Sequence, residues 1–182
     1  VEPLMRQLAT DFAGKKLLDL SGLAVGDGRP IPRISYRDAM ETYGSDKPDL
    51  RFGMELIELT NVFADTEFGV FKNAECIKAI CVKNGASLSR KQIDQFTDIA
   101  KSEGAGGLAY ITYQDGEAKS PIAKFLSEAE LAAIKQKTGA ADGDAVFFGA
   151  DTRPVVNAVL GRLRNEFAAH FDLKKSDEVA LA

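Results

Sequence analysis

The sequence is poor in the residues that usually build metal and redox centres. It has no tryptophan, one histidine and two cysteines in 182 residues, so the chain holds neither a metal site with two histidines nor a relay of several histidines. No apolar run reaches the roughly 20 residues of a membrane-spanning helix, and the first residues, VEPLMRQLAT, lack the features of a secretory signal. We therefore expect a soluble, cytoplasmic protein without a membrane partner. The missing initiator methionine indicates a piece of a longer chain.

The two cysteines and the net charge exclude further kinds of site. Cys76 and Cys81 stand five residues apart in an apolar stretch, and in a strand this spacing points them to opposite faces. We expect two reduced thiols rather than a disulfide or a shared metal site. The net charge of −4 gives no general basic surface for nucleic acid, although a local basic face can still contact phosphates.

Three short motifs carry weak signals for chemistry. The GAGG stretch at 104–107 follows a predicted helix and precedes a predicted strand, the reverse of a dinucleotide-binding order, so it predicts a helix end and a tight turn. His170 is expected in the last turn of the final helix, where its charge complements the helix dipole. A nucleophilic pair of His170 with one of the cysteines is the alternative. Arg90 and Lys91 begin a predicted helix, where they are either solvated or meet a phosphate.

Hydrophobic periodicity predicts a chain of mixed helices and strands. Helices are predicted over 1–12, 35–44, 89–104, 127–139 and 153–171, strands over 54–59, 67–72, 76–83, 107–113 and 145–150, and a loop over 14–32. Several strands follow each other directly, which favours an α+β fold over a doubly wound one. We expect a two-layer sandwich, a mainly antiparallel sheet with helices packed on one face, after an N-terminal connector of helix and loop without a strand.

The stretch YGSDKPDLR is the densest group of polar side chains in the sequence. Its candidate site residues are Tyr43, Gly44, Ser45, Asp46, Lys47, Pro48, Asp49 and Arg51. Proline keeps Lys47 extended, the two acids can accept bonds from nearby backbone N–H groups, and Arg51 can pair with either acid. These residues leave two alternatives open, a connector that satisfies its own backbone or a ligand-binding loop.

The same stretch resembles the segment leading into the insertion domain, or GAD domain, of bacterial-type aspartyl-tRNA synthetases. Further blocks resemble the family in the same order: GASLSRKQID (85–94), GLAYI (107–111), SPIAKFLS (120–127), GDAVFFGAD (143–151) and LGRLR (160–164). The resemblance implies a GAD-type fold and three parts: a connector from the catalytic body (1–50), the GAD domain (51–173) and a return linker (174–182). The segment SYRDAMETYGSDKPDLR points to the synthetase rather than to the amidotransferase subunit that also carries a GAD domain.

The resemblance implies an accessory module rather than a catalyst. Members of the family join aspartate to its tRNA with ATP and Mg²⁺ at class II motifs that this sequence lacks, so no catalytic, cofactor-binding or metal-binding residue is assigned to the chain. The parent enzyme is expected to be a homodimer, and the partners are the rest of its catalytic domain and tRNA-Asp. The insertion domain is expected beside the acceptor stem, with residues 43–51 as the hinge to the catalytic body.

Two other functions remain open from the sequence. The chain can be a standalone RNA- or protein-binding module, or the GAD domain of a glutamyl-tRNA amidotransferase subunit. For RNA, the candidate facing residues are Arg90, Lys91, Arg153, Arg162 and Arg164.

Overall fold

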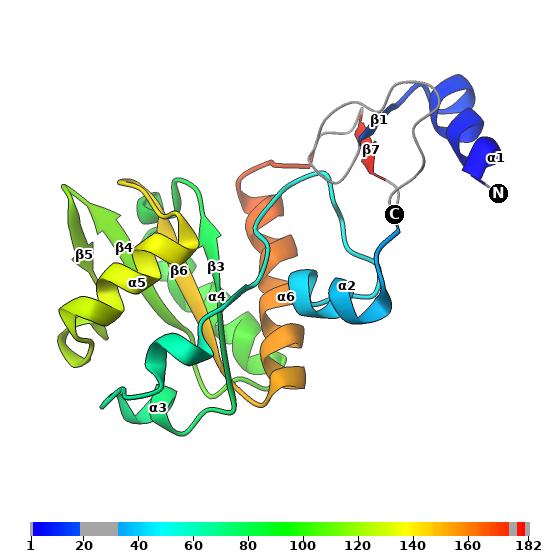
Figure 1. The fold of residues 1–182 in the computed structure, drawn as a ribbon. Helices are drawn as coiled ribbons and strands as arrows, with labels where there is room; N and C mark the ends of the chain where they lie inside the picture. Colours follow the sequence, from blue (N-terminus) through cyan, green and yellow to red (C-terminus); the bar gives the residue numbers. More distant parts are fainter. Residues whose placement is uncertain (1, 19–32, 175–177, 181–182) are drawn as a thin grey trace.

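The centre of the molecule is a five-stranded sheet in the order β2–β3–β6–β4–β5, with every neighbouring pair antiparallel (Figure 1). The computed structural model describes residues 2–18, 33–174 and 178–180. The strands of this sheet are β2 (Ile57–Glu58), β3 (Cys76–Val82), β4 (Ala109–Gln114), β5 (Glu117–Lys119) and β6 (Ala145–Asp151). β3 and β6 pair along their whole length, so they form the rigid middle of the sheet.

Helices cover both faces of this sheet. They are α2 (Tyr36–Tyr43), α3 (Gly69–Lys72), α4 (Arg90–Ser102), α5 (Glu128–Thr138) and α6 (Arg153–His170), with short 3₁₀ turns at Thr60–Phe63 (η2), Gly85–Ser87 (η3) and Ala123–Phe125 (η4). In β3, Ile80 points into a core with α4 and α6, whereas Ile77 points into a second core with α5, η2 and α3.

The expected α+β class with an antiparallel sheet is confirmed, but the expected placement of helices on one face is wrong. The reason lies in β3 and β6, which are almost continuously apolar and buried. Such a run indicates a strand covered on both sides, because a half-exposed strand alternates apolar and polar residues.

The predicted helix ends are confirmed where a capping residue marks them. Ser89 with Gln92 and Ser127 with Glu130 form capping boxes at the starts of α4 and α5. Gly139 ends α5 with φ 61°, in the left-handed region that glycine adopts readily. The residues that form these hydrogen bonds are close together in the sequence, so the sequence predicts them.

Two of the predicted strands are corrected. Residues 67–72 form no strand, and Gly69–Lys72 within them form the helix α3. Phe68 and Phe71, three residues apart, turn toward the same core, and a short apolar run does not distinguish helix from strand. The strand predicted over 54–59 shrinks to the two residues of β2. Met54 has φ 61°, and the N–H of Leu56 bonds the Thr42 carbonyl instead of a strand.

The N-terminal part contains a strand that was not expected. Residues 2–12 are helical, as α1 (Glu2–Gln7) followed by a π-helical turn (Leu8–Phe12), in agreement with the predicted helix. β1 (Lys16–Leu18) then pairs in parallel with β7 (Glu178–Ala180). The two strands lie near opposite ends of the sequence, so no local sequence pattern predicts this pairing. The rest of the loop predicted over 14–32 falls on 19–32, outside the described residues.

The parallel β1–β7 pair brings the two ends of the described chain together, apart from the main sheet (Figure 1). In the described ranges, no helix is long and apolar enough to cross a membrane.

Candidate functional site: the joint between connector and domain

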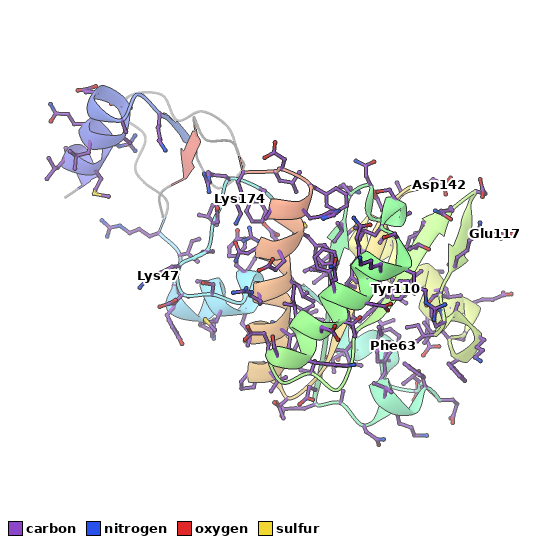
Figure 2. All side chains as sticks on the ribbon, turned by 180° about the vertical axis from the view of Figure 1, so that it is seen from behind. Lys47, Phe63, Tyr110, Glu117, Asp142 and Lys174 are labelled. Atoms are coloured by element: carbon purple, nitrogen blue, oxygen red, sulfur yellow. The ribbon has the colours of Figure 1, made fainter. Side chains whose placement is uncertain are left out.

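The signature stretch of the sequence lies where α2 meets α6. We call this region the joint and define it as α2 with residues 44–53, packed against α6 and β3. Figure 2 shows Lys47 beside α2 and Lys174 just beyond α6. The Lys174 ammonium lies 5.7 Å from the centre of the Phe52 ring, so the last residues of the folded domain contact the joint as well.

The polar side chains of the stretch mostly bind its own backbone and each other. Arg51 donates two hydrogen bonds to the Asp49 carboxylate, from Nε to Oδ1 (2.9 Å) and from Nη2 to Oδ2 (2.7 Å), and this bond lowers the pKa of Asp49. The N–H of Lys47 donates to Ser45 Oγ at 3.1 Å. Of the two alternatives left open by the sequence, this geometry favours the connector that satisfies its own backbone.

Arg164 of α6 holds the backbone of the stretch. Its side chain is 1% exposed. Nη2 donates to the carbonyls of Asp49 (2.7 Å) and Phe52 (2.9 Å), and Nε donates to the carbonyl of Gly53 (3.1 Å). The guanidinium lies between two rings, 4.9 Å from Tyr43 and 4.2 Å from Phe52. Burial lowers the pKa of Arg164 to about 10, which leaves it charged at neutral pH.

Backbones touch where α2 ends. Gly44, with φ 67°, is the left-handed residue after the helix, as predicted. A Cβ on Gly161 would overlap the Gly44 carbonyl, and a Cβ on Gly44 would overlap the carbonyl of Asn157. Only glycine therefore fits on either side, and the two helices cross at backbone contact.

A buried lysine joins α2 to the sheet. Lys78 of β3 is 2% exposed, and its Nζ donates to the Glu41 carbonyl (2.8 Å), to Glu41 Oε2 (2.6 Å) and to Asn157 Oδ1 (2.9 Å). Glu41 Oε2 also accepts from Arg153 Nη1 at 2.7 Å, and that guanidinium contacts Glu58 at 2.9 Å. The hydrogen bond from Lys78 lowers the pKa of Glu41, and the bonds to Glu58 and Glu41 raise the pKa of Arg153.

The sequence interpretation missed this lysine, although a signal was present. Lys78 stands in the middle of the apolar stretch CIKAICV, and a charged residue inside a buried strand requires a partner. The sequence does not tell which acid supplies that partner, since Glu41 is 37 residues away.

The five residues considered for contact with RNA are not alike in the structure. Arg164 is buried in the joint, which corrects its assignment as an RNA-facing residue. Arg153 is tied to two carboxylates, and Arg162, 55% exposed, pairs with Glu166 one helical turn later. Arg90 and Lys91 are exposed on the first turn of α4.

The cations at the start of α4 and at the start of α6 lie far apart along these two packed helices. The amide of Gln92 is 3.3 Å from Nε2 of His170, so the first turn of α4 lies beside the last turn of α6. Arg153, in contrast, occupies the first turn of α6. The structure therefore does not gather the arginines of α6 and the start of α4 into one basic face.

The predicted placements of the two cysteines, His170 and Gly104 are confirmed. Cys76 and Cys81 are free and belong to the two different cores. His170 stands in the last turn of α6, and Gly104, with φ 100°, turns the chain between α4 and β4. Within the described ranges, no group of three or more His, Cys, Asp or Glu side chains can hold a metal ion.

The two lowered pKa values predict acid sensitivity of the joint. The ordinary pKa values are 4.5 for Glu41 and 3.8 for Asp49, and both are lowered in the folded chain. The stabilisation is therefore complete above about pH 5 and is lost as the pH falls through the folded pKa values. We expect denaturant titrations at pH 7, 5, 4 and 3 to show a steep loss of stability below pH 4.5.

The matched control for this prediction is the double variant Glu41→Gln with Asp49→Asn. It should be less stable than the natural chain at pH 7, and its stability should change less between pH 5 and pH 3. An unchanged dependence on pH in the double variant would contradict the assignment.

Comparisons with known proteins give one family and one group of relatives. The family model described as GAD domain matches residues 69–160. A protein of Shouchella clausii (strain KSM-K16) named "Aspartate--tRNA ligase" is 51% identical over 150 residues, covering 80% of this chain and 26% of that protein. A protein of Beutenbergia cavernae named "Aspartate--tRNA(Asp/Asn) ligase" is 51% identical over 141 residues, covering 76% of this chain and 23% of its own length.

The similarity extends to other bacteria and, weakly, to a solved structure. The "Aspartate--tRNA(Asp/Asn) ligase" of Mycobacterium avium (strain 104) is 50% identical over 146 residues, which covers 80% of this chain and 24% of that protein. The solved structure of "Hypothetical protein PH0730 from Pyrococcus horikoshii OT3" has a TM-score of 0.40 and 21% identity over 54% of this chain and 56% of its own. The chain thus spans about a quarter of the length of the curated relatives it matches.

Proposed function

Because the chain belongs to the GAD domain family, we propose that it is the accessory insertion domain of an aspartate–tRNA ligase, together with the connector that attaches it. The parts are the connector (1–50), the insertion domain (51–173) and the return linker (174–182). The parent enzyme charges tRNA-Asp with aspartate, using ATP and Mg²⁺ at catalytic motifs outside this chain. The domain itself catalyses no step.

The observation that carries this proposal is the extent of the identity. About half of the residues are identical over 150 positions, well beyond the 69–160 matched by the family model. A GAD domain used in an unrelated protein would share the domain but not its flanks. The connector is therefore the part that favours a ligase over the amidotransferase subunit.

The pairing of β1 with β7 supports an insertion. The region between them, residues 19–177, leaves a two-stranded parallel sheet and returns to it. Parallel neighbours need a long crossover rather than a hairpin, and here the crossover is a whole domain. A two-stranded sheet is marginal alone, so we propose that β1 and β7 belong to the body of the parent enzyme.

We propose that residues 43–51, expected from the sequence to be the hinge, act as a fixed attachment instead. Arg164 and the glycine contact bind the stretch to α6, and Lys78 binds the preceding helix to β3. We propose that α2 and the domain turn as one body, with the pivot outside residues 33–174. Arg90 and Lys91 remain the candidates for a contact with the acceptor stem, because both are exposed.

A deletion tests this function in a full-length relative. In the Shouchella clausii ligase, the counterpart of residues 33–174 is replaced by a glycine–serine linker of about eight residues. At about 3.3 Å per residue, this linker is long enough to connect the end of β1 with the start of β7. ATP–pyrophosphate exchange should persist, whereas charging of tRNA-Asp should fall by about tenfold, or about 1.4 kcal/mol.

The isolated chain is the companion measurement. It should give no ATP–pyrophosphate exchange at any concentration of aspartate. Exchange by the isolated chain, or its complete loss in a deletion variant that still forms its normal oligomer, would overturn the accessory role.

A further inference from the structure

Three large apolar side chains of the domain are exposed, and two of them lie on neighbouring elements. Val70 is 58% exposed and Phe125 is 50% exposed, whereas the third, Leu173 (38% exposed), follows α6. Val70 belongs to α3 and Phe125 to η4, 55 residues later. Phe68, just before α3, stacks on the Phe125 ring with centroids 5.4 Å apart and planes 11° apart. We call Phe68, Val70 and Phe125 the ridge.

The ridge is anchored to the sheet by a chain of rings. Phe68 packs edge-on against Phe71 at 4.9 Å, and Phe71 lies 5.5 Å from Phe148 of β6. Phe71 and Phe148 are buried. The exposed ring is therefore held in one place by a rigid core. A surface ordered in advance loses little entropy on binding.

A hollow lies on each side of the ridge. One, of about 480 Å³, is lined mostly by apolar groups, among them Phe71, Ile122 and Phe148, and it has the size for a large side chain. The other, of about 500 Å³, lies between η2 and α5, with Phe125 in its wall.

The second hollow has an excess of acidic groups. Asp65, Glu67 and Glu130 line it together with Lys124, and Glu67 also pairs with Lys72 at 3.6 Å. Lys124 lies over the Phe125 ring at 4.9 Å. The pKa of Glu130 is lowered, because hydrogen bonds from Ser127 and Thr66 outweigh its burial, so it stays ionised at neutral pH. Three carboxylates beside an apolar ridge repel phosphates and favour a cationic side chain.

We propose that the ridge and its two hollows are a protein-docking surface for a segment that carries a large apolar side chain next to lysine or arginine. The apolar side chain fills the hollow over Phe148, and the cation lies among the carboxylates near Asp65. Apolar exposed patches rimmed by charge mark interaction sites, and the acidic rim distinguishes this one from an RNA surface. Figure 1 places α3 and α5 away from α2 and the chain ends, so the surface lies on the side of the domain opposite its attachment.

An array of immobilised nine-residue peptides tests the proposal. The residue at the centre of each peptide is phenylalanine, leucine or serine. The residues on both sides of it are basic (lysine or arginine), neutral (serine) or acidic (aspartate or glutamate). The labelled chain should be retained by the peptides with an apolar centre and basic flanks, and by no acidic-flanked peptide. The variants are Phe125→Ser and the charge reversal Asp65→Lys with Glu67→Lys, compared with Tyr36→Ser, which changes another exposed ring, 73% exposed.

Both ridge variants should lose at least tenfold in retention, and Tyr36→Ser should bind as the natural chain does. Because Tyr36 and the two acids are exposed, thermal unfolding of Tyr36→Ser and of the charge reversal should match that of the natural chain. Phe125→Ser loses the stacking on Phe68, so its melting temperature should fall by about a few degrees while the chain stays folded. Absence of retention on the whole array, equal retention by acidic-flanked peptides, or full retention by Phe125→Ser would each overturn the proposal. So would concentration-dependent dimerisation that Phe125→Ser abolishes, which would assign the ridge to a second copy, or competition by oligouridylate, which would assign it to RNA.

Discussion

Replacing Arg164 with methionine is expected to lower the free energy of unfolding by about 3–5 kcal/mol. Methionine keeps much of the aliphatic volume but donates no hydrogen bond. The carbonyls of Asp49, Phe52 and Gly53 then lose their donor, at about 1–3 kcal/mol for each that stays buried without a partner. The loss is large beside the about 5–15 kcal/mol of a typical domain, so denaturant unfolding of the isolated chain measures it directly.

The same helix supplies the control. Arg162 lies two residues away, is 55% exposed on its side chain and pairs with Glu166 on the surface. Arg162→Met should cost at most about 0.5 kcal/mol, as expected for an exposed pair one turn apart. Arg164→Lys should recover little stability, because an ammonium group cannot present the planar fork that reaches three carbonyls. Equal losses for the two methionine variants would show that Arg164 does not hold the joint.

Gly161→Ala is expected to destabilise the chain by about 2 kcal/mol or more, or to detach α2. In most helices a change from glycine to alanine stabilises by about 0.5–1 kcal/mol, so the expected effect has the opposite sign. The added methyl group would overlap the Gly44 carbonyl, and overpacking of this kind costs about 1–3 kcal/mol. Hydrogen exchange of residues 36–56 distinguishes the two outcomes, since detachment exposes the amide of Leu56 that bonds Thr42.

The control for this variant is Gly53→Ala, in the same joint. No atom lies within 4 Å of the place where its Cβ would stand, and its carbonyl bond to Arg164 is kept. Its unfolding should match that of the natural chain. A stabilising Gly161→Ala would contradict the close contact of α2 with α6.

The contacts tested by Arg164→Met and Gly161→Ala explain why the signature stretch contains so many charges. The side chains of Asp49 and Arg51 bind each other, and the carbonyls of the stretch bind Arg164. Such a network fixes the direction in which the chain enters the domain. For an inserted domain, that direction sets where its outer surfaces stand relative to the parent enzyme.

The sequence by itself determined the features that depend on near neighbours. Capping boxes, the glycine ends of α2 and α5, the long helix α6 and the strands β3, β4 and β6 follow from residues a few positions apart. The pairing of Asp49 with Arg51 belongs here too, because the two residues are separated by one position. The family followed from blocks of sequence in a fixed order.

Only the tertiary structure decided what depends on distant segments. It placed helices on both sides of the sheet, made Gly69–Lys72 a helix instead of part of a strand, and paired β1 with β7. It also moved Arg164 from an expected surface to the interior, where its partners are carbonyls 111 to 115 positions away. The sequence alone does not show whether the guanidinium of an arginine faces water or three carbonyls. Its role is set by what the fold brings within hydrogen-bonding distance.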